Sequence, residues 1–87
     1  MYYLYLILCS ERSIYTGVTN NPERRFLEHH TNQGSKHTRE HKAIELLHTE
    51  RFSTREEALR REKQLKGWTR VKKEALIVDD KELLKKL

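Results

Sequence analysis

Apolar and polar positions divide the first thirty residues into three short elements. The run Tyr2–Cys9, YYLYLILC, is apolar or aromatic throughout and is followed by the polar turn SERS, as is typical of a buried central strand. A second β-branched and aromatic run, SIYTGV, begins at Ser13, so the two runs predict an antiparallel hairpin. Asn21 then provides an N-cap and Pro22 a first helical residue, which predicts a helix from about Pro22 to His30.

The remainder of the chain alternates polar and amphipathic segments. Residues 31–42, TNQGSKHTREHK, lack apolar periodicity and predict a polar surface loop, whereas 43–52, AIELLHTERF, predict a third strand. Ser53 and Glu56 form a capping box for a helix that should end near Gly67. Thr69 is positioned to cap a further helix through about Val78, and residues 79–87, DDKELLKKL, read as a short amphipathic tail helix.

This order of elements predicts the fold class α+β, with a small three-stranded antiparallel sheet flanked by helices. A chain of 87 residues has room for one domain, which we expect to span 1–78, with a C-terminal helical tail at 79–87. The N-terminal apolar run lacks a basic leader and is far shorter than the roughly 20 residues that span a bilayer. We therefore expect no membrane association and a cytoplasmic location.

The net positive charge of the chain indicates a class of binding partner. The chain has 18 Lys and Arg residues and 13 Asp and Glu residues, which gives a formal net charge of +5 and a pI near 9.5. This balance is expected of a protein that binds nucleic acid, although it also serves solubility alone. The one cysteine, Cys9, excludes an internal disulfide and fits a reducing compartment. With so few thiols, the histidines do not indicate a structural zinc site.

The hairpin allows two registers with different consequences. A three-residue loop, Ser10–Arg12, places Tyr5 opposite Gly17 and makes Tyr5 and Tyr15 diagonal neighbours on one face of the sheet. A two-residue loop places Tyr5 opposite Val18 instead and sends the two tyrosines to opposite faces. A site that uses both tyrosines requires the three-residue loop or a bulge.

A carboxylate interrupts the apolar stripe of the helix after the third strand. Ala58, Leu59, Leu65 and the stem of Lys66 form the stripe, and Glu62 falls within it by helical spacing. Glu62 either lies at the edge of the stripe and pairs with an arginine, or serves as a metal ligand or acid–base group. Spacing leaves both interpretations open.

The first helix carries a cation and a titratable group on one face. Arg25 and His29 are four residues apart, and Phe26 lies beside them in a position to enter the core. The helix is either an ordinary solvated basic helix or one wall of a site.

Together these features resemble the GIY-YIG nuclease superfamily. LYL at Leu4–Leu6, followed by YTG at Tyr15–Gly17, resembles its paired signature, and both segments keep the tyrosine while departing from the signature elsewhere. Arg25, His29 and Glu62, the last within ALRREKQLK, match the family's spacing. The resemblance spans Tyr2 to about Ile77. It is especially close to small stand-alone bacterial members, whose GKGAKYTR-like loop is similar to GSKHTR here.

The resemblance implies a GIY-YIG fold and a metal-dependent DNA endonuclease that nicks by hydrolysis. It implies the catalytic set Tyr5, Tyr15, Arg25, His29 and Glu62. Glu62 would hold a single Mg²⁺ or Mn²⁺, and Arg25 would bind the phosphate. A tyrosine would accept the proton of the attacking water, Tyr5 being preferred over Tyr15, with His29 hydrogen-bonded nearby. Some relatives have a lysine shortly after the second motif, whereas this chain has Val18 and Thr19 there.

The basic side chains either contact the DNA backbone or lie on solvated helix faces. The candidates for phosphate binding are Lys36, Arg39, Lys42, Arg61 and Lys66. No segment resembles a base-reading recognition helix, so we expect selectivity for DNA structure, such as branched or single-stranded DNA, with a protein partner as a further source of targeting. The alternative functions are a non-catalytic nucleic-acid-binding module that retains the fold, and a purely structural basic domain.

Overall fold

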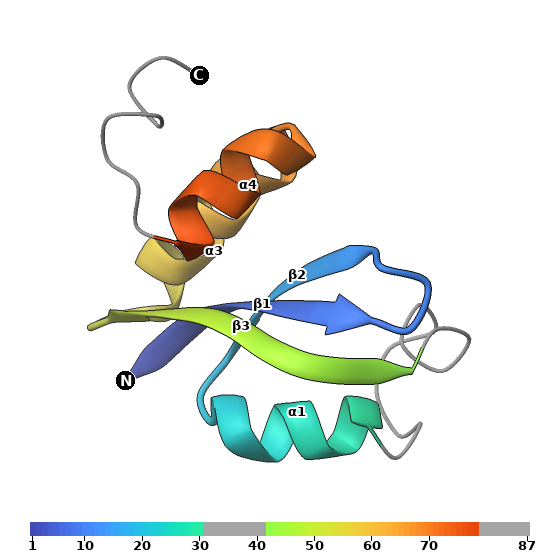
Figure 1. Cartoon of the computed structure of the whole chain (residues 1–87). Coiled ribbons are helices and arrows are strands. Elements are labelled where there is room, and N and C mark those ends of the chain that lie inside the picture. The colour runs from blue at the N-terminus through green and yellow to red at the C-terminus, as the bar shows by residue number, and fades with distance from the viewer. Residues whose placement is uncertain (31–41, 79–87) are drawn as a thin grey trace.

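The computed structural model describes residues 1–30 and 42–78, and it confirms the α+β architecture. Strands β1 (Tyr2–Cys9), β2 (Ile14–Thr19) and β3 (Ala43–Phe52) form an antiparallel sheet in the order β2-β1-β3. Helix α1 (Pro22–His30) covers one face, and α3 (Arg55–Lys66) and α4 (Arg70–Ile77) lie on the other (Figure 1). The loop predicted over 31–42, except its last residue, and the tail helix predicted over 79–87 lie outside the described residues.

The hairpin between β1 and β2 adopts the three-residue loop. Tyr5 pairs with Gly17 in the register, as the longer of the two predicted loops requires. The Cys9 N–H donates to the Ser13 carbonyl at 2.9 Å, and Arg12 adopts a φ of 71°, in the left-handed region. A left-handed third residue is characteristic of three-residue hairpin loops.

Side-chain alternation along β1 supplies two separate cores. One core lies beneath α3 and α4 and is formed by the buried residues Leu4, Leu6, Leu65 and Leu76. The other lies on the α1 side and is formed by Tyr5, Ile7, Cys9 and Ala43, with Phe26 packed against it. Because β1 is the central strand, it is buried on both faces, as its uninterrupted apolar run predicts.

The helix starts agree with the sequence at two of three positions. Asn21 caps α1, since its Oδ1 accepts the Arg24 N–H at 3.1 Å, and Thr69 caps α4. The prediction that Ser53 caps α3 is wrong by one residue: Thr54 accepts the Glu57 N–H at 3.3 Å. Both Ser53 with Glu56 and Thr54 with Glu57 fit the capping-box spacing, so spacing alone cannot choose between them.

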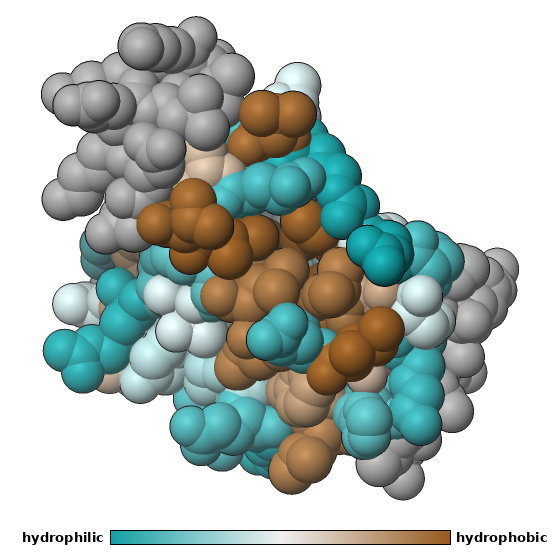
Figure 2. Space-filling model, viewed as in Figure 1, coloured by the Kyte–Doolittle hydropathy of each residue, from teal (hydrophilic) through white to brown (hydrophobic). Residues whose placement is uncertain are grey.

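The apolar stripe of α3 is narrower than predicted. Ala58 and Leu65 are fully buried, but Leu59 is 36% exposed and the Lys66 side chain projects into solvent. Helix α3 therefore rests on the sheet through few apolar side chains of its own, although apolar side chains gather where the helices meet the sheet (Figure 2). None of the described helices is long and apolar enough to cross a membrane.

Candidate active site at the β2 edge of the sheet

The ring of Tyr5 lies directly over Gly17 of the edge strand. Tyr5 is only 2% exposed. A Cβ atom at position 17 would stand 2.5 Å from Tyr5 Cζ and would overlap the hydroxyl oxygen. The absence of a side chain at Gly17 therefore lets Tyr5 extend from the central strand across β2, toward the free edge of the sheet.

Tyr15 and His29 complete an aromatic cluster around the Tyr5 hydroxyl. The Tyr5 oxygen lies 3.1 Å from His29 Nε2, within hydrogen-bond distance, and His29 is fully buried. The Tyr15 ring centroid lies 6.2 Å from that of Tyr5 and 5.3 Å, edge-on, from that of His29. The structure thus brings together two strand residues and one residue of α1 that are far apart in the sequence.

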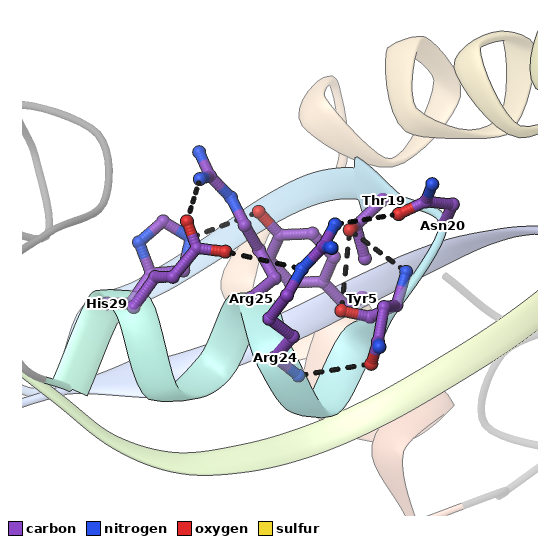
Figure 3. A network of polar contacts seen from close by, with 8 residues as sticks. Tyr5, Thr19, Asn20, Arg24, Arg25 and His29 are labelled. Atoms are coloured by element: carbon purple, nitrogen blue, oxygen red, sulfur yellow. Dashed lines mark hydrogen bonds and ion pairs between the residues drawn. The ribbon is translucent and has the colours of Figure 1, made fainter.

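Arg25 adds a cation at the same place. Its side chain lies beside that of Tyr5, and its Nη1 donates to Glu28 Oε2 at 3.3 Å (Figure 3). The neighbouring Arg24 is more exposed and donates from Nη2 to Asn20 Oδ1 at 3.1 Å. Of the two adjacent arginines, Arg25 is the one beside the tyrosine.

The electrostatic environment keeps Tyr5 protonated at neutral pH. Burial raises the pKa of Tyr5 to about 12, and the nearby Tyr15 and Glu62 act in the same direction. A hydrogen bond from Arg25 and its positive charge oppose this increase in pKa without cancelling it. Tyr5 is therefore a neutral phenol in the free protein.

Glu62 lies in the other layer of the fold, on the helix that packs against β2. It lies on α3, which packs against β2 from the face opposite α1, and its side chain is 20% exposed. Its charge contributes to the raised pKa of Tyr5, so the two groups interact electrostatically around the edge of the sheet. The ion-pair partner of Glu62 is Lys66, at 3.5 Å, rather than an arginine.

The donor set at Glu62 fits a hard divalent cation held by one protein ligand. Among residues 1–30 and 42–78, no group of three or more His, Cys, Asp or Glu side chains could enclose a metal ion. A partly exposed lone carboxylate suits Mg²⁺ or Mn²⁺, because Mg²⁺ commonly uses one or two carboxylates and takes its other ligands from water and substrate phosphates. The same set does not suit zinc, which requires three or four protein ligands.

The predicted phosphate-binding residues differ in how available they are. Lys42 and Lys66 are exposed, although Lys66 also pairs with Glu62. Lys36 and Arg39 lie outside the described residues. The two exposed lysines therefore lie apart in the sequence, one just before β3 and one at the end of α3.

Arg61 is engaged in the protein itself. Its Nε and Nη2 contact the two carboxylate oxygens of Glu50 at 2.9 and 3.3 Å, and its Nη1 donates to Gln64 at 2.9 Å. The guanidinium also lies 5.1 Å from the ring centroid of Trp68, in cation–π geometry. These contacts tie α3 to β3 and account for Arg61 without any bound phosphate.

Sequence reasoning did not identify Glu28 as part of this arrangement. Its carboxylate contacts both Arg24 and Arg25. The available signal was its spacing, four and three residues after the arginines, which places all three side chains on one side of α1.

Comparison with known proteins identifies a family. The family described as the GIY-YIG catalytic domain matches residues 1–75. A UPF0213 protein of Natronomonas pharaonis is 43% identical over 79 residues, which cover 91% of this chain and 93% of the relative. A UPF0213 protein of Enterococcus faecalis is 43% identical over 75 residues, covering 84% of this chain and 85% of the relative.

Two solved structures share the fold. The solution NMR structure of the UPF0213 protein BH0048 from Bacillus halodurans superimposes with a TM-score of 0.57 at 38% identity, covering 90% of this chain and 84% of that one. The NMR structure of EF2693 from E. faecalis gives a TM-score of 0.59 at 41% identity, covering 90% of this chain and 83% of that one. The signature tyrosines, the matching spacing, the shared fold and the family match lead to one conclusion: the chain belongs to the GIY-YIG family.

Proposed function

We propose that the protein is a divalent-metal-dependent endonuclease that hydrolyses phosphodiester bonds in DNA and leaves nicks. The observation that carries this proposal is the contact of the Tyr5 hydroxyl with His29 Nε2 at 3.1 Å, with the Arg25 guanidinium beside the same hydroxyl. Phosphodiester hydrolysis needs a group that accepts a proton from water and a cation that stabilises charge on the phosphate. Both kinds of group meet here.

The raised pKa of Tyr5 favours a proton relay over a free phenolate. In this relay the Tyr5 oxygen accepts the proton of the attacking water while the phenolic proton passes to His29 Nε2, so Tyr5 stays neutral throughout. The His29 tautomer with an unprotonated Nε2 is the one that accepts the proton. Tyr15, half-buried at the same edge, would orient the water or a phosphate oxygen.

Arg25 and Glu62 would act on the phosphate from two sides. The planar guanidinium of Arg25 can donate to two phosphate oxygens at once, which a lysine cannot do. Glu62 would hold a Mg²⁺ or Mn²⁺ ion, whose charge stabilises the leaving oxygen. Because Arg25 lies on α1 and Glu62 on α3, the substrate strand would cross the β2 edge between the two layers.

Binding would depend on the DNA backbone rather than on base sequence. Exposed lysines such as Lys42 and Lys66 supply charge without hydrogen-bonding geometry specific to a base edge. We therefore propose selectivity for branched or single-stranded DNA, with affinity that falls as salt rises.

The test is nicking of supercoiled plasmid and of branched and single-stranded oligonucleotides, with Mg²⁺, Mn²⁺ or EDTA. We expect metal-dependent cleavage that Glu62→Ala lowers at least a hundredfold, in line with removal of a principal electrostatic group. Glu56→Ala, which makes the same charge change in the exposed first turn of α3, is the matched control and should cleave normally. Cleavage that persists in Glu62→Ala would contradict the mechanism. Salt-dependent DNA binding without cleavage by the unmodified protein would indicate the non-catalytic module instead.

A further inference from the structure

Glu28 bridges the two arginines of α1. Its Oε2 lies 3.3 Å from Arg25 Nη1, and its Oε1 lies 3.7 Å from Arg24 Nε (Figure 3). Arg24 in turn donates from Nη2 to Asn20 Oδ1 at 3.1 Å. One carboxylate thus connects a guanidinium of the candidate site to a second guanidinium that is held at the surface.

The contact with Arg25 is more sheltered than an ordinary helix surface pair. The Arg25 and Glu28 side chains are 32% and 33% exposed, whereas that of Arg24 is 63% exposed. A fully exposed ion pair on a helix hardly restricts the positions of its two side chains, because water screens the charges and both side chains remain free to move. Partial burial reduces that screening, so Glu28 is able to restrict where the Arg25 guanidinium lies.

Arg25 needs such a restraint more than its neighbours in the cluster do. Tyr5 and His29 are held by burial, at 2% and 0% exposure, but the guanidinium of Arg25 stands at the end of a long stem with several rotatable bonds. The contact of Nη1 with Glu28 Oε2, at 3.3 Å, limits the positions open to this guanidinium, which lies beside Tyr5. Donors that are oriented before the substrate arrives contribute most to stabilising a transition state.

We propose that Glu28 is a positioning residue, which holds the Arg25 guanidinium at the Tyr5 hydroxyl so that the phosphate meets a donor already in place. This inference rests on the proposed nuclease function. Glu28 acts through Arg25 and not on the phosphate, which a carboxylate repels. Its removal should therefore slow the chemical step without weakening the binding of DNA.

The kinetic test compares Glu28→Ala with Glu23→Ala. Glu23 is exposed, lies on the same helix, and its replacement makes the same change in net charge. We expect Glu28→Ala to lower kcat by about 10- to 100-fold, the range expected for a misplaced catalytic group, while the Kd for DNA stays equal or falls. Glu28→Gln keeps an acceptor at the same reach and should recover part of the rate. Equal kcat values for Glu28→Ala and Glu23→Ala would overturn the proposal.

A second measurement does not require activity. In NMR spectra, nuclear Overhauser contacts between the Arg25 side chain and the Tyr5 ring should be present in the unmodified protein and in Glu23→Ala. They should be lost in Glu28→Ala and retained in part in Glu28→Gln, with the backbone spectrum unchanged. Contacts that persist in Glu28→Ala would overturn the positioning role, whether or not DNA is cleaved. Absence of cleavage by the unmodified protein would instead overturn the nuclease function, and the NMR result would still decide the role of Glu28.

Discussion

The ring of Tyr5 fills the space that any side chain at position 17 would need. The two residues are direct partners in the β1–β2 register, and Gly17 does not have a positive φ. A glycine stands there because of close approach by a neighbouring ring rather than because of an unusual backbone conformation. The site and the packing of the edge strand therefore depend on the same pair.

Gly17→Ala should destabilise the protein and abolish the proposed cleavage, because the new methyl group displaces the Tyr5 hydroxyl from His29. We expect a loss of about 1–3 kcal/mol in the free energy of unfolding, as for other overpacked sites. The control is Gly67→Ala, where the added Cβ would meet its nearest neighbour, the Gln64 carbonyl oxygen, at an ordinary 3.6 Å. Urea unfolding of both variants checks this prediction, and equal stabilities would contradict it.

Tyr5 should make stability fall in alkaline solution. Its pKa is about 12 in the folded protein and 10.0 as the ordinary value, so the unfolded chain loses this proton first. The contribution is fully present below pH 10 and is lost as pH rises from 10 to 12, up to about 3 kcal/mol by linkage. Tyr5→Phe lacks this group, so its unfolding free energy should fall less steeply over that interval. Parallel curves from urea titrations at each pH would refute the assignment.

Glu50 should make stability fall in acid. Hydrogen bonding by His48, at 2.9 Å, and then contact with Arg61 lower the pKa of Glu50 from 4.5 to about 2. A carboxylate with a depressed pKa contributes stability above its unfolded value, and this is lost as pH falls from about 4.5 to 2.

Glu50→Gln should therefore lose about 1–3 kcal/mol at pH 7, because it leaves the half-buried Arg61 without its charged partner. The difference from the unmodified protein should narrow below pH 4. Glu45→Gln, on an exposed position of the same strand, is the control and should change stability by less than about 0.5 kcal/mol. Thermal or urea unfolding against pH measures both; a difference for Glu50→Gln that is independent of pH would count against the ion pair.

Arg12→Gly should stabilise the hairpin. Arg12 has a φ of 71°, a region that disfavours residues with a Cβ atom, by roughly 1 kcal/mol. The hydrogen bond that Arg70 donates to this residue uses the backbone carbonyl of Arg12, so glycine preserves it. Ser10→Gly, in the same loop but without a positive φ, should give no gain. A lower melting temperature for Arg12→Gly than for Ser10→Gly would show that the Arg12 side chain contributes more than its backbone strain costs.

Local patterns predicted the elements well because their signals are local. The uninterrupted apolar run of β1, the Asn21–Pro22 start of α1 and the Thr69 cap all act within a few residues of themselves. For the hairpin, the sequence left two possible loop lengths. The choice between them depends on Arg12 adopting a left-handed φ, which a non-glycine residue does not signal in the sequence.

Contacts between segments that are distant in the sequence could not be predicted as well from local patterns. Charge alone made Arg61 a candidate for phosphate binding, because nothing near it in the sequence reveals that β3 brings Glu50 alongside. Glu62 was recognised as unusual from its helical spacing, but its partner proved to be Lys66. The importance of Glu28 depends on partial burial, which separates its contact with Arg25 from the many surface pairs that share the same spacing.

The pairing of β1 with β2, rather than the length of the turn between them, fixes the face that Tyr15 occupies. Side chains alternate between the two faces of a strand, so a shift of β2 by one residue along β1 would turn Tyr15 toward the leucine core beneath α3. A turn of another length that keeps Ile7 opposite Tyr15 would leave Tyr15 on the same face as Tyr5. The surface turn is therefore free to vary in length, whereas the register of the edge strand is a requirement of the site.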